Sequence, residues 1–148
     1  MSRDLPLSEI TLRKYEKPYE ADKRELVKKV CLSLGLLQPG DSRDVIVDIL
    51  GVLIKTSKER KKLTSIEIQK HVEEIRKAAN LELKGIAESN IRRQLKRLRD
   101  LMIIDKKKNL YHLSEFESLK NIFESKIEKF LITQASERIK EYLAELDK

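Results

Sequence analysis

The sequence contains little that would cross-link the chain or interrupt its helices. The single cysteine, Cys31, excludes an internal disulfide, and the apolar, helical spacing around it predicts a small buried side chain rather than a reactive thiol. Only four glycines and three prolines occur in 148 residues. With 40% hydrophobic and 39% charged residues, the composition excludes a disordered chain and a membrane protein. It predicts a soluble, mainly helical fold with its own core.

Long apolar runs and enzyme motifs are also missing. No run approaches the ~20 apolar residues of a membrane span, and residues 1–6 lack the apolar segment of a signal peptide, so we expect a cytoplasmic protein. His71 and His112 have no cysteine or second histidine at metal-ligand spacing, and we therefore expect no metal and no cofactor. No nucleophile motif is present, so we expect no enzyme. A buried carboxylate pair stays open on the sequence alone.

Positive charge is concentrated in one stretch of the chain. The formal net charge is +7, and residues 84–112 alone hold nine basic and three acidic residues, a net of +6. Residues 113–148 have a net charge of −2. A localised patch on an otherwise balanced chain is typical of a polyanion-binding face, although a solvated helix face is the simpler alternative. The abundance of lysine and glutamate is also typical of thermophilic proteins.

The first third of the chain predicts an arm and two helices. Residues 1–18 contain two prolines and predict an arm with a short strand or a single helical turn. Apolar residues at helical spacing predict a first helix over residues 19–34 that stops at Gly35. Ser42 is a suitable N-cap for a second helix, and the broad apolar stripe of residues 45–54 predicts that this helix is largely buried.

A capping box predicts the start of a third helix. Thr64 and Glu67 are spaced to satisfy each other's free backbone N–H groups, which predicts a helix over about residues 65–79. A turn ending at Gly85 follows this helix. The apolar residues of the helix that we expect to face the core are Ile68, Val72 and Ile75.

Residues 87–101 predict a fourth helix with one apolar and one cationic face. At ~100° per residue, Ile91, Leu95 and Leu98 fall in one narrow sector, together with Met102. The opposite half of the helix carries the polar and basic residues Ser89, Asn90, Arg92, Arg93, Lys96, Arg97 and Arg99.

A short hairpin and a long helical region complete the chain. Residues 102–105 and 110–113 predict two strands, and the turn between them carries Lys106, Lys107 and Lys108. From residue 114 onward there is no glycine or proline, and regularly spaced apolar residues predict one or two long amphipathic helices.

The order of buried helix, capped helix, turn, basic helix and hairpin resembles the winged helix-turn-helix superfamily, in the broad style of archaeal and bacterial MarR-like and ArsR-like regulators. The segment from Ser89 to Ile104 looks like the recognition helix of that family running into its first wing strand. The resemblance implies a mainly α fold with a small β-hairpin wing. Residues 1–40 would form an N-terminal arm and helix, residues 41–113 the winged helix-turn-helix, and residues 114–148 a C-terminal dimerisation or packing region.

Two features depart from the family pattern. The family often has glycine where Met102 stands, so the turn from helix to strand is expected to form without a left-handed residue, or the helix to end differently. The connection from Ala79 to Ala87 is also longer than the tight turn of the family.

The resemblance implies a regulator of transcription that binds double-stranded DNA. The N-terminal half of the basic helix would enter the major groove, with Ser89, Asn90, Arg92 and Arg93 near base edges. The residues expected at phosphates are Lys96, Arg97, Arg99, Lys106, Lys107 and Lys108. Two copies are expected to pair as a homodimer through residues 114–148.

Two other functions stay open. The winged helix could be a protein-interaction subunit of a larger replication, transcription or chromosome assembly, with the apolar stripe after Ser114 as its partner surface. It could also be an architectural protein that coats DNA without regard to sequence. RNA ranks lower, because Tyr111 is the only aromatic residue near the basic patch and single strands need stacking platforms.

Overall fold

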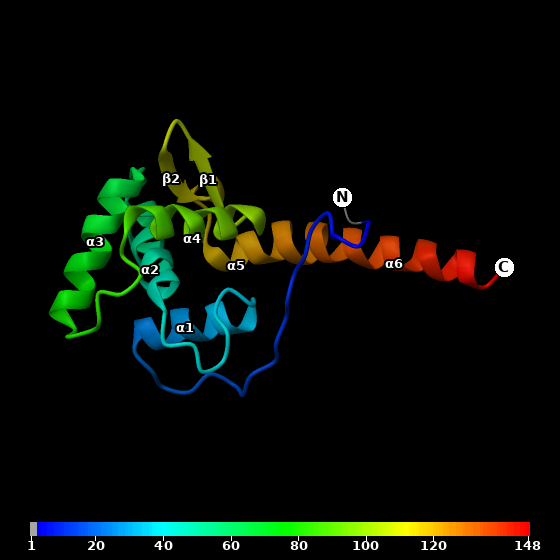
Figure 1. Cartoon of the computed structure of the whole chain (residues 1–148), viewed down its shortest axis with the longest axis horizontal. Coiled ribbons are helices and arrows are strands. Elements are labelled where there is room, and N and C mark those ends of the chain that lie inside the picture. The colour runs from blue at the N-terminus through cyan, green and yellow to red at the C-terminus, as the bar shows by residue number, and fades with distance from the viewer. Residues whose placement is uncertain (1–2) are drawn as a thin grey trace.

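Helices make up most of the computed structural model, which describes residues 3–148 (Figure 1). One two-stranded antiparallel sheet is present among these residues. In chain order the elements are α1 (Lys23–Ser33), α2 (Val45–Lys58), α3 (Ser65–Ala78), α4 (Glu88–Asp100), β1 (Ile104–Lys107), β2 (Leu110–Leu113), the 3-10 turn η1 (Ser114–Phe116), α5 (Leu119–Ile122), the π-helical stretch η2 (Phe123–Ile132) and α6 (Thr133–Leu146). Within the described part of the chain, no helix combines the length and the apolar character needed to span a membrane.

The core is built around α2, as its apolar stripe predicted. This helix contacts α1, α3, α4 and β2, and Ile49, Leu50 and Leu53 are fully buried. Its C-terminal end also supports the hairpin, because the hydroxyl of the buried Ser57 accepts a hydrogen bond from the backbone N–H of Leu113 at 2.9 Å. The central helix thereby fixes the positions of both α4 and the hairpin.

The helix α3 starts where the sequence predicted, but the set of its residues that face the core differs from the prediction. The Thr64 hydroxyl accepts a hydrogen bond from the Glu67 N–H at 3.2 Å, and the Glu67 carboxylate accepts one from the Thr64 N–H at 2.9 Å, which confirms the capping box. The inward position expected for Ile75 was wrong, because that side chain is 39% exposed. Arg76 is buried instead, since it bonds carboxylates on α2.

The predicted starts of the first two helices were wrong. The helix α2 begins at Val45 rather than directly after Ser42, and its N-cap Asp44 makes no side-chain capping bond, because its carboxylate bonds two arginines instead. The helix α1 begins at Lys23 rather than near residue 19, since the Asp22 side chain caps it by accepting from the Glu25 N–H at 2.9 Å.

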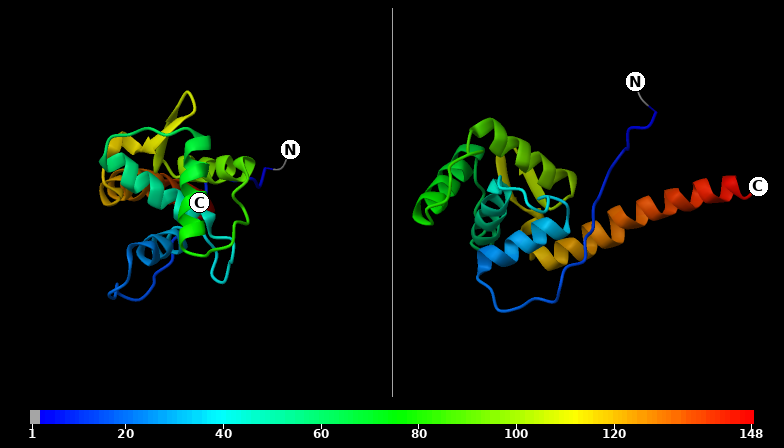
Figure 2. Two further views of the ribbon diagram at one scale, coloured as in Figure 1. Left: turned by 90° about the vertical axis from the view of Figure 1, so that its left-hand side faces the viewer. Right: turned by 60° about the horizontal axis from the view of Figure 1, so that its bottom comes forward.

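The N-terminal arm is irregular where the sequence predicted a strand or a helical turn. Residues 1–2 of that arm lie outside the described residues, and the remainder up to α1 forms neither element. The arm is held at Arg13, whose guanidinium donates to the carbonyl oxygens of Leu32 at 2.8 Å and Leu37 at 3.1 Å. Because Arg13 binds these carbonyl groups and the arm runs across the C-terminal end of α1, a regular element is not needed to anchor it (Figure 2).

The hairpin is confirmed, but its turn is shorter than predicted. Residues 104–107 pair with residues 110–113, and the connecting residues are only Lys108 and Asn109. Both have positive φ, 51° and 62°, the conformation of a type I′ hairpin turn. The predicted turn over residues 106–109 was therefore too long, because Lys106 and Lys107 continue strand β1.

Met102 corrects the expectation for the turn between α4 and β1. This residue has a φ of 62°, so the left-handed conformation that glycine usually supplies is adopted here by methionine. The amide of Met102 donates to the Arg99 carbonyl at 2.8 Å, and that of Ile103 donates to the Leu98 carbonyl at 3.0 Å. These bonds close the helix end, and the fully buried Ile103 anchors the chain that leads into β1.

The C-terminal region is one continuous helical rod. The backbone stays helical across the junctions of α5, η2 and α6. Ile122 and Ile127 are buried against the body, whereas every residue from 133 to 148 is exposed. The rod therefore packs at its N-terminal end and projects away from the body at the other (Figures 1 and 2).

Candidate nucleic-acid interface

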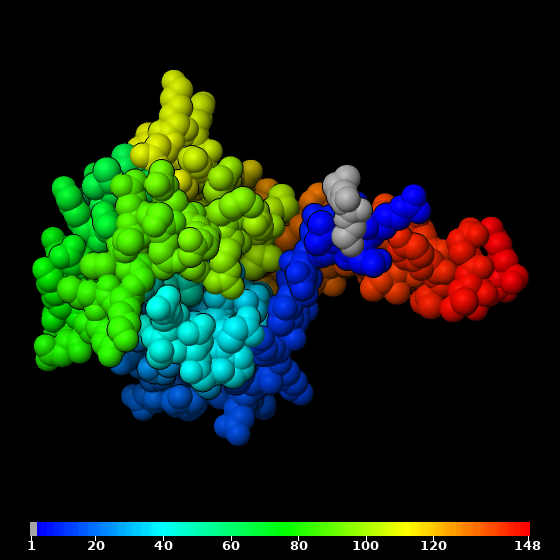
Figure 3. Space-filling model, viewed as in Figure 1, coloured from blue at the N-terminus to red at the C-terminus, as the bar shows by residue number. Residues whose placement is uncertain are grey.

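The apolar side of α4 fixes the direction in which its cationic side points. Ile91, Leu95 and Leu98 are completely buried, as the helical spacing predicted. The helix packs on α2 and α3 and lies next to β1. Five polar or basic side chains of the opposite face are exposed, namely Ser89, Arg92, Arg93, Lys96 and Arg99. In the space-filling view, residues of α4 form a band across the front of the molecule, below the protruding hairpin (Figure 3).

The ion pairs on this face are exposed to solvent. Arg92 Nε lies 3.9 Å from Glu88 Oε1, and Lys96 Nζ lies 3.3 Å from Asp100 Oδ2. In each pair the basic side chain is more than half exposed, 58% for Arg92 and 69% for Lys96. Pairs of this kind contribute little to stability, because water and salt screen them. Both cations can therefore exchange their carboxylate partner for a phosphate at small cost.

Asn90 and Arg97, which are expected at DNA, are only half-exposed and bond backbone groups outside α4. The Asn90 side-chain amide donates to the Gly85 carbonyl at 2.7 Å, and its oxygen accepts from Gln94 Nε2 at 3.2 Å. Arg97 donates to the Gly35 carbonyl at 3.2 Å and to Gln94 Oε1 at 2.7 Å. Asn90 thus holds the turn that precedes α4, and Arg97 ties α4 to the end of α1.

The hairpin adds a second cationic surface next to the helix. Lys106, Lys107 and Lys108 are all exposed. Lys106 Nζ lies 5.8 Å from the ring centre of Tyr111, its direct partner across the hairpin. Lys108 occupies the turn itself. The strand β1 contacts α4, and the hairpin that carries the lysines rises directly above the band formed by α4 (Figure 3).

A third set of cations lies beside the hairpin, and the sequence alone did not place it there. Leu63 forms a bridge with Tyr111, with N–H to carbonyl distances of 3.1 Å and 2.8 Å in the two directions. This bridge brings the end of the basic connector, residues 55–62, against β2. Lys62 is exposed directly before the bridge. The one sequence feature that could have indicated this position is the apolar Leu63, which stands between a run of basic residues and the capping box.

A buried cluster of charges joins α1, α2 and α3. Asp48 and Arg76 are each only 3% exposed. Arg76 Nη1 donates to Asp48 Oδ2 at 2.7 Å and to Asp44 Oδ1 at 3.0 Å. Arg24 donates to Asp48 Oδ1 and to Asp44 Oδ2, both at 3.0 Å. Every oxygen of the two carboxylates therefore accepts a hydrogen bond from a guanidinium group.

The carboxylate pair that the sequence left open thus exists and is fully bonded. Burial would raise the pKa of Asp44, but hydrogen bonds from Arg24 and Arg76 outweigh it and hold the pKa below its ordinary value. The hydrogen bond to Asp48 raises the pKa of Arg24 in turn. An ionised carboxylate whose oxygens are all occupied is poorly suited to transfer protons. This cluster holds three helices together.

Other reactive groups are few. Cys31 is completely buried, as predicted, and burial raises the pKa of its thiol to about 12. Among residues 3–148, no three histidine, cysteine or acidic side chains are grouped so that they could hold a metal ion.

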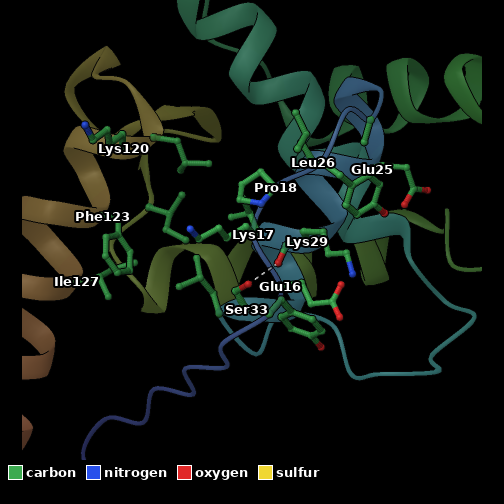
Figure 4. Close-up of a pocket in the computed structure, with 17 residues that line it drawn as sticks. Glu16, Lys17, Pro18, Glu25, Leu26, Lys29, Ser33, Lys120, Phe123 and Ile127 are labelled. Carbon is green, nitrogen blue, oxygen red and sulfur yellow. Dashed lines mark hydrogen bonds between the residues drawn. The ribbon is translucent and has the colours of Figure 1, made fainter.

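An apolar pocket of about 720 Å³ lies between the arm, α1 and the rod (Figure 4). Leu26 and Phe123 lie on opposite sides of it, and Lys17, Lys29 and Lys120 also line it. No histidine or cysteine occurs among the described residues that line it. No residue of α4 lines the pocket.

Comparison of the chain with models of known protein families, with curated proteins and with solved structures gave no match.

Proposed function

We propose that this protein binds double-stranded DNA as a winged helix-turn-helix regulator of transcription. The observation that carries the proposal is the exposed cationic face of α4, which is held by a fully buried apolar face and continued by the lysines of the adjacent hairpin. An α-helix fits the major groove of B-DNA, and the guanidinium group of arginine can bond two acceptors of guanine.

The arrangement around α4 supports the winged-helix part of the proposal. The helices α3 and α4 contact each other, and the Gln69 side chain on α3 donates to the Ile86 carbonyl at 2.8 Å, just before α4 begins. The hairpin follows α4 directly, and Leu63 adds a bridge at its edge. In a winged helix the wing is such a hairpin, placed next to the recognition helix.

The exposure of the side chains divides the proposed contacts into three groups. Ser89, Arg92 and Arg93 lie in the N-terminal half of α4 and are assigned to base edges. Asn90 and Arg97 would first have to release their partners within the protein, so we assign them to positioning the helix. Phosphates are assigned to the exposed bases Lys62, Lys96, Arg99, Lys106, Lys107 and Lys108.

The proposal includes a homodimer formed through residues 114–148. Two-fold symmetry would present two copies of α4 to one duplex, separated by a whole number of duplex turns of about 34 Å each. A palindromic DNA site is the expected consequence.

A protein-interaction subunit is the second candidate, and one observation favours it. Ile139, Tyr142, Leu143 and Leu146 of α6 are at least half exposed, and such a surface suits a protein partner. The two candidates differ in the partner that the molecule requires, which a DNA-binding measurement decides.

The test selects bound fragments from genomic DNA and then measures the affinity of single variants for the selected site and for random duplex. Arg93→Ala is expected to weaken the selected site about 5- to 150-fold and random duplex much less, because it loses base contacts. Lys107→Ala should weaken both to the same degree. Lys129→Ala changes an exposed lysine of the rod and is the matched control.

Three outcomes would count against regulation of specific genes. If no fragment is enriched and both variants lose affinity for all DNA alike, the protein is an architectural DNA binder. If the unmodified protein does not shift any duplex at ~50 mM salt, DNA binding itself is excluded and the protein-interaction role takes its place. If Lys129→Ala lowers the affinity for DNA as much as Arg93→Ala does, α4 is not the DNA-binding surface.

A further inference from the structure

The exposed part of the rod carries an apolar stripe that the chain itself does not cover. Ile139 is 58% exposed, Tyr142 71% and Leu146 77%. Their spacing of three and four residues places these side chains on one face of α6. A helix in water gains its stability mainly by burying such a face, so this one requires a partner.

The total surface of the chain also indicates a missing partner. The accessible surface is 10511 Å², whereas a compact monomer of 17.3 kDa is expected to expose about 7,800 Å². The difference of roughly 2,700 Å² exceeds the ~800 Å² that each partner of a standard interface covers. The projecting rod and the extended arm are the parts of the fold that add this surface (Figure 2).

The residues of α6 follow a seven-residue repeat. Ile139 and Leu146 occupy its first position, and Ala135 and Tyr142 its fourth, which are the two core positions of a coiled coil. Arg138 and Glu145 occupy the seventh position, next to the core. Side chains at that position form ion pairs between the helices of a coiled coil and select their orientation.

We propose that α6 pairs with α6 of a second copy of this chain in antiparallel orientation. In the proposed register Ile139 lies against Tyr142 of the partner subunit, and Ala135 lies against Leu146 of the partner subunit. This specifies the contact of the homodimer in the proposed function, and it does not depend on whether the molecule binds DNA.

The charges and the length of the rod both favour the antiparallel orientation. In this register Arg138 lies beside Glu145 of the partner subunit, and by symmetry the pair occurs twice. In a parallel pair Arg138 would lie beside Leu143 of the partner subunit and would keep only its own Glu141, 3.5 Å away, as a charge partner. The antiparallel register also places residue 133 opposite residue 148 of the partner subunit. The exposed stretch of each chain is then covered by the same stretch of the other, and the two bodies lie at opposite ends of the paired helices.

The test uses cysteine cross-linking in the full-length protein. The native Cys31 is buried and stays unreactive, so Ala135→Cys and Leu146→Cys each introduce one accessible thiol. An equal mixture of the two variants is expected to form a covalent dimer under mild oxidation, at least about fivefold more than either variant alone. Ala144→Cys, on the opposite face of α6, replaces Ala135→Cys in the control mixture and should give only background.

The results that overturn the pairing are distinct. Strong cross-linking of each variant with itself would show a parallel pair, and a mixture no better than the control would show that α6 does not pair. Duplex binding of the reduced variants is measured alongside. If the variants bind DNA but do not cross-link, the proposed pairing is wrong and the proposed function stands. If they cross-link but do not bind DNA, the proposed function is wrong and the pairing stands.

Charge reversal provides a second test that does not require cysteine. Arg138→Glu and Glu145→Arg are each expected to raise the dimer dissociation constant about tenfold, because each creates two repulsive pairs. The double variant should recover the original constant, as measured by analytical ultracentrifugation. Weakening that the double variant does not reverse would contradict the register.

Discussion

Two sets of arginines in this chain differ in what surrounds them. Arg24 and Arg76 lie between α1, α2 and α3, where every oxygen of two carboxylates accepts their hydrogen bonds. Arg92 and Arg93 lie on the outer face of α4, where their contacts with Glu88 at 3.9 Å and with Asn90 Oδ1 at 3.4 Å are long. The first set is bonded within the protein, and the second is available to a partner.

The difference follows from the cost of burying charge. A buried guanidinium group requires a carboxylate, because desolvation is otherwise too costly. An exposed one retains its hydration and gains little from a neighbouring acid. The buried cluster should therefore matter for folding and the face of α4 for binding, and separate variants should affect each property alone.

The largest expected effect is the loss of a buried carboxylate. Asp48→Ala should lower the free energy of unfolding by about 3–5 kcal/mol, because the buried Arg76 and the partly exposed Arg24 lose a shared partner. Urea denaturation measures this change. Asp100→Ala removes the exposed partner of Lys96 and is the matched control, with an expected change within about 0.5 kcal/mol. Similar losses of unfolding free energy in both variants would contradict the distinction between buried and exposed ion pairs.

The second expected effect is a loss of folding stability in acid, which comes from the same cluster of charges. The pKa of Asp44 is lower in the folded protein than its ordinary value of 3.8, so the folded state binds fewer protons there than the unfolded state. The stability that Asp44 provides is complete above that ordinary value and is lost as the pH falls through the lower folded value.

Urea midpoints between about pH 6 and pH 2 measure this dependence. The backbone and side-chain hydrogen bonds of Thr64 lower the pKa of Glu67 in the capping box, which adds a dependence of the same sign. The difference between the original protein and Asp44→Asn isolates the cluster, and the variant should lose less stability in acid. Parallel curves would show that Asp44 does not contribute.

The smallest expected effect is at Lys108, where one substitution should raise stability and weaken DNA binding. Lys108 adopts a φ of 51° in the hairpin turn, a conformation that costs a lysine about 1 kcal/mol and glycine almost nothing. Lys108→Gly should therefore raise the free energy of unfolding by up to about 1 kcal/mol. The same change removes one proposed phosphate contact and should reduce the slope of log affinity against log salt by about 0.9. A more stable variant with an unchanged slope would exclude Lys108 from the interface.

Local patterns in the sequence predicted local structure well. The spacing of Ile91, Leu95 and Leu98 fixed the buried face of α4, and the Thr64–Glu67 capping box fixed the start of α3. Both depend on residues a few positions apart. The hairpin was also predicted, although the alternation of its residues did not show that Lys106 and Lys107 belong to the strand.

Features that depend on distant residues could not be predicted in this way. Arg76 turns inward because its carboxylate partners lie 32 and 28 residues earlier in the chain, so helical spacing alone favoured Ile75. Lys62 lies beside the hairpin only because Leu63 bridges to Tyr111. The left-handed conformation of Met102 was not expected of methionine, and it arises where the helix end and the buried Ile103 fix the chain.

The affinity of the protein for duplex DNA as a function of salt tests the central proposal most directly. With the six phosphate contacts assigned to each subunit we predict a slope of about −5.4 for each subunit bound, equivalent to a loss of roughly 2,000-fold in the affinity per subunit between about 50 and 200 mM salt. Replacing Lys106, Lys107 and Lys108 by alanine should make the slope less steep by about 2.7. Absence of duplex binding at ~50 mM salt, or a slope that the triple variant does not change, would contradict the proposal that α4 and the hairpin form a DNA-binding face.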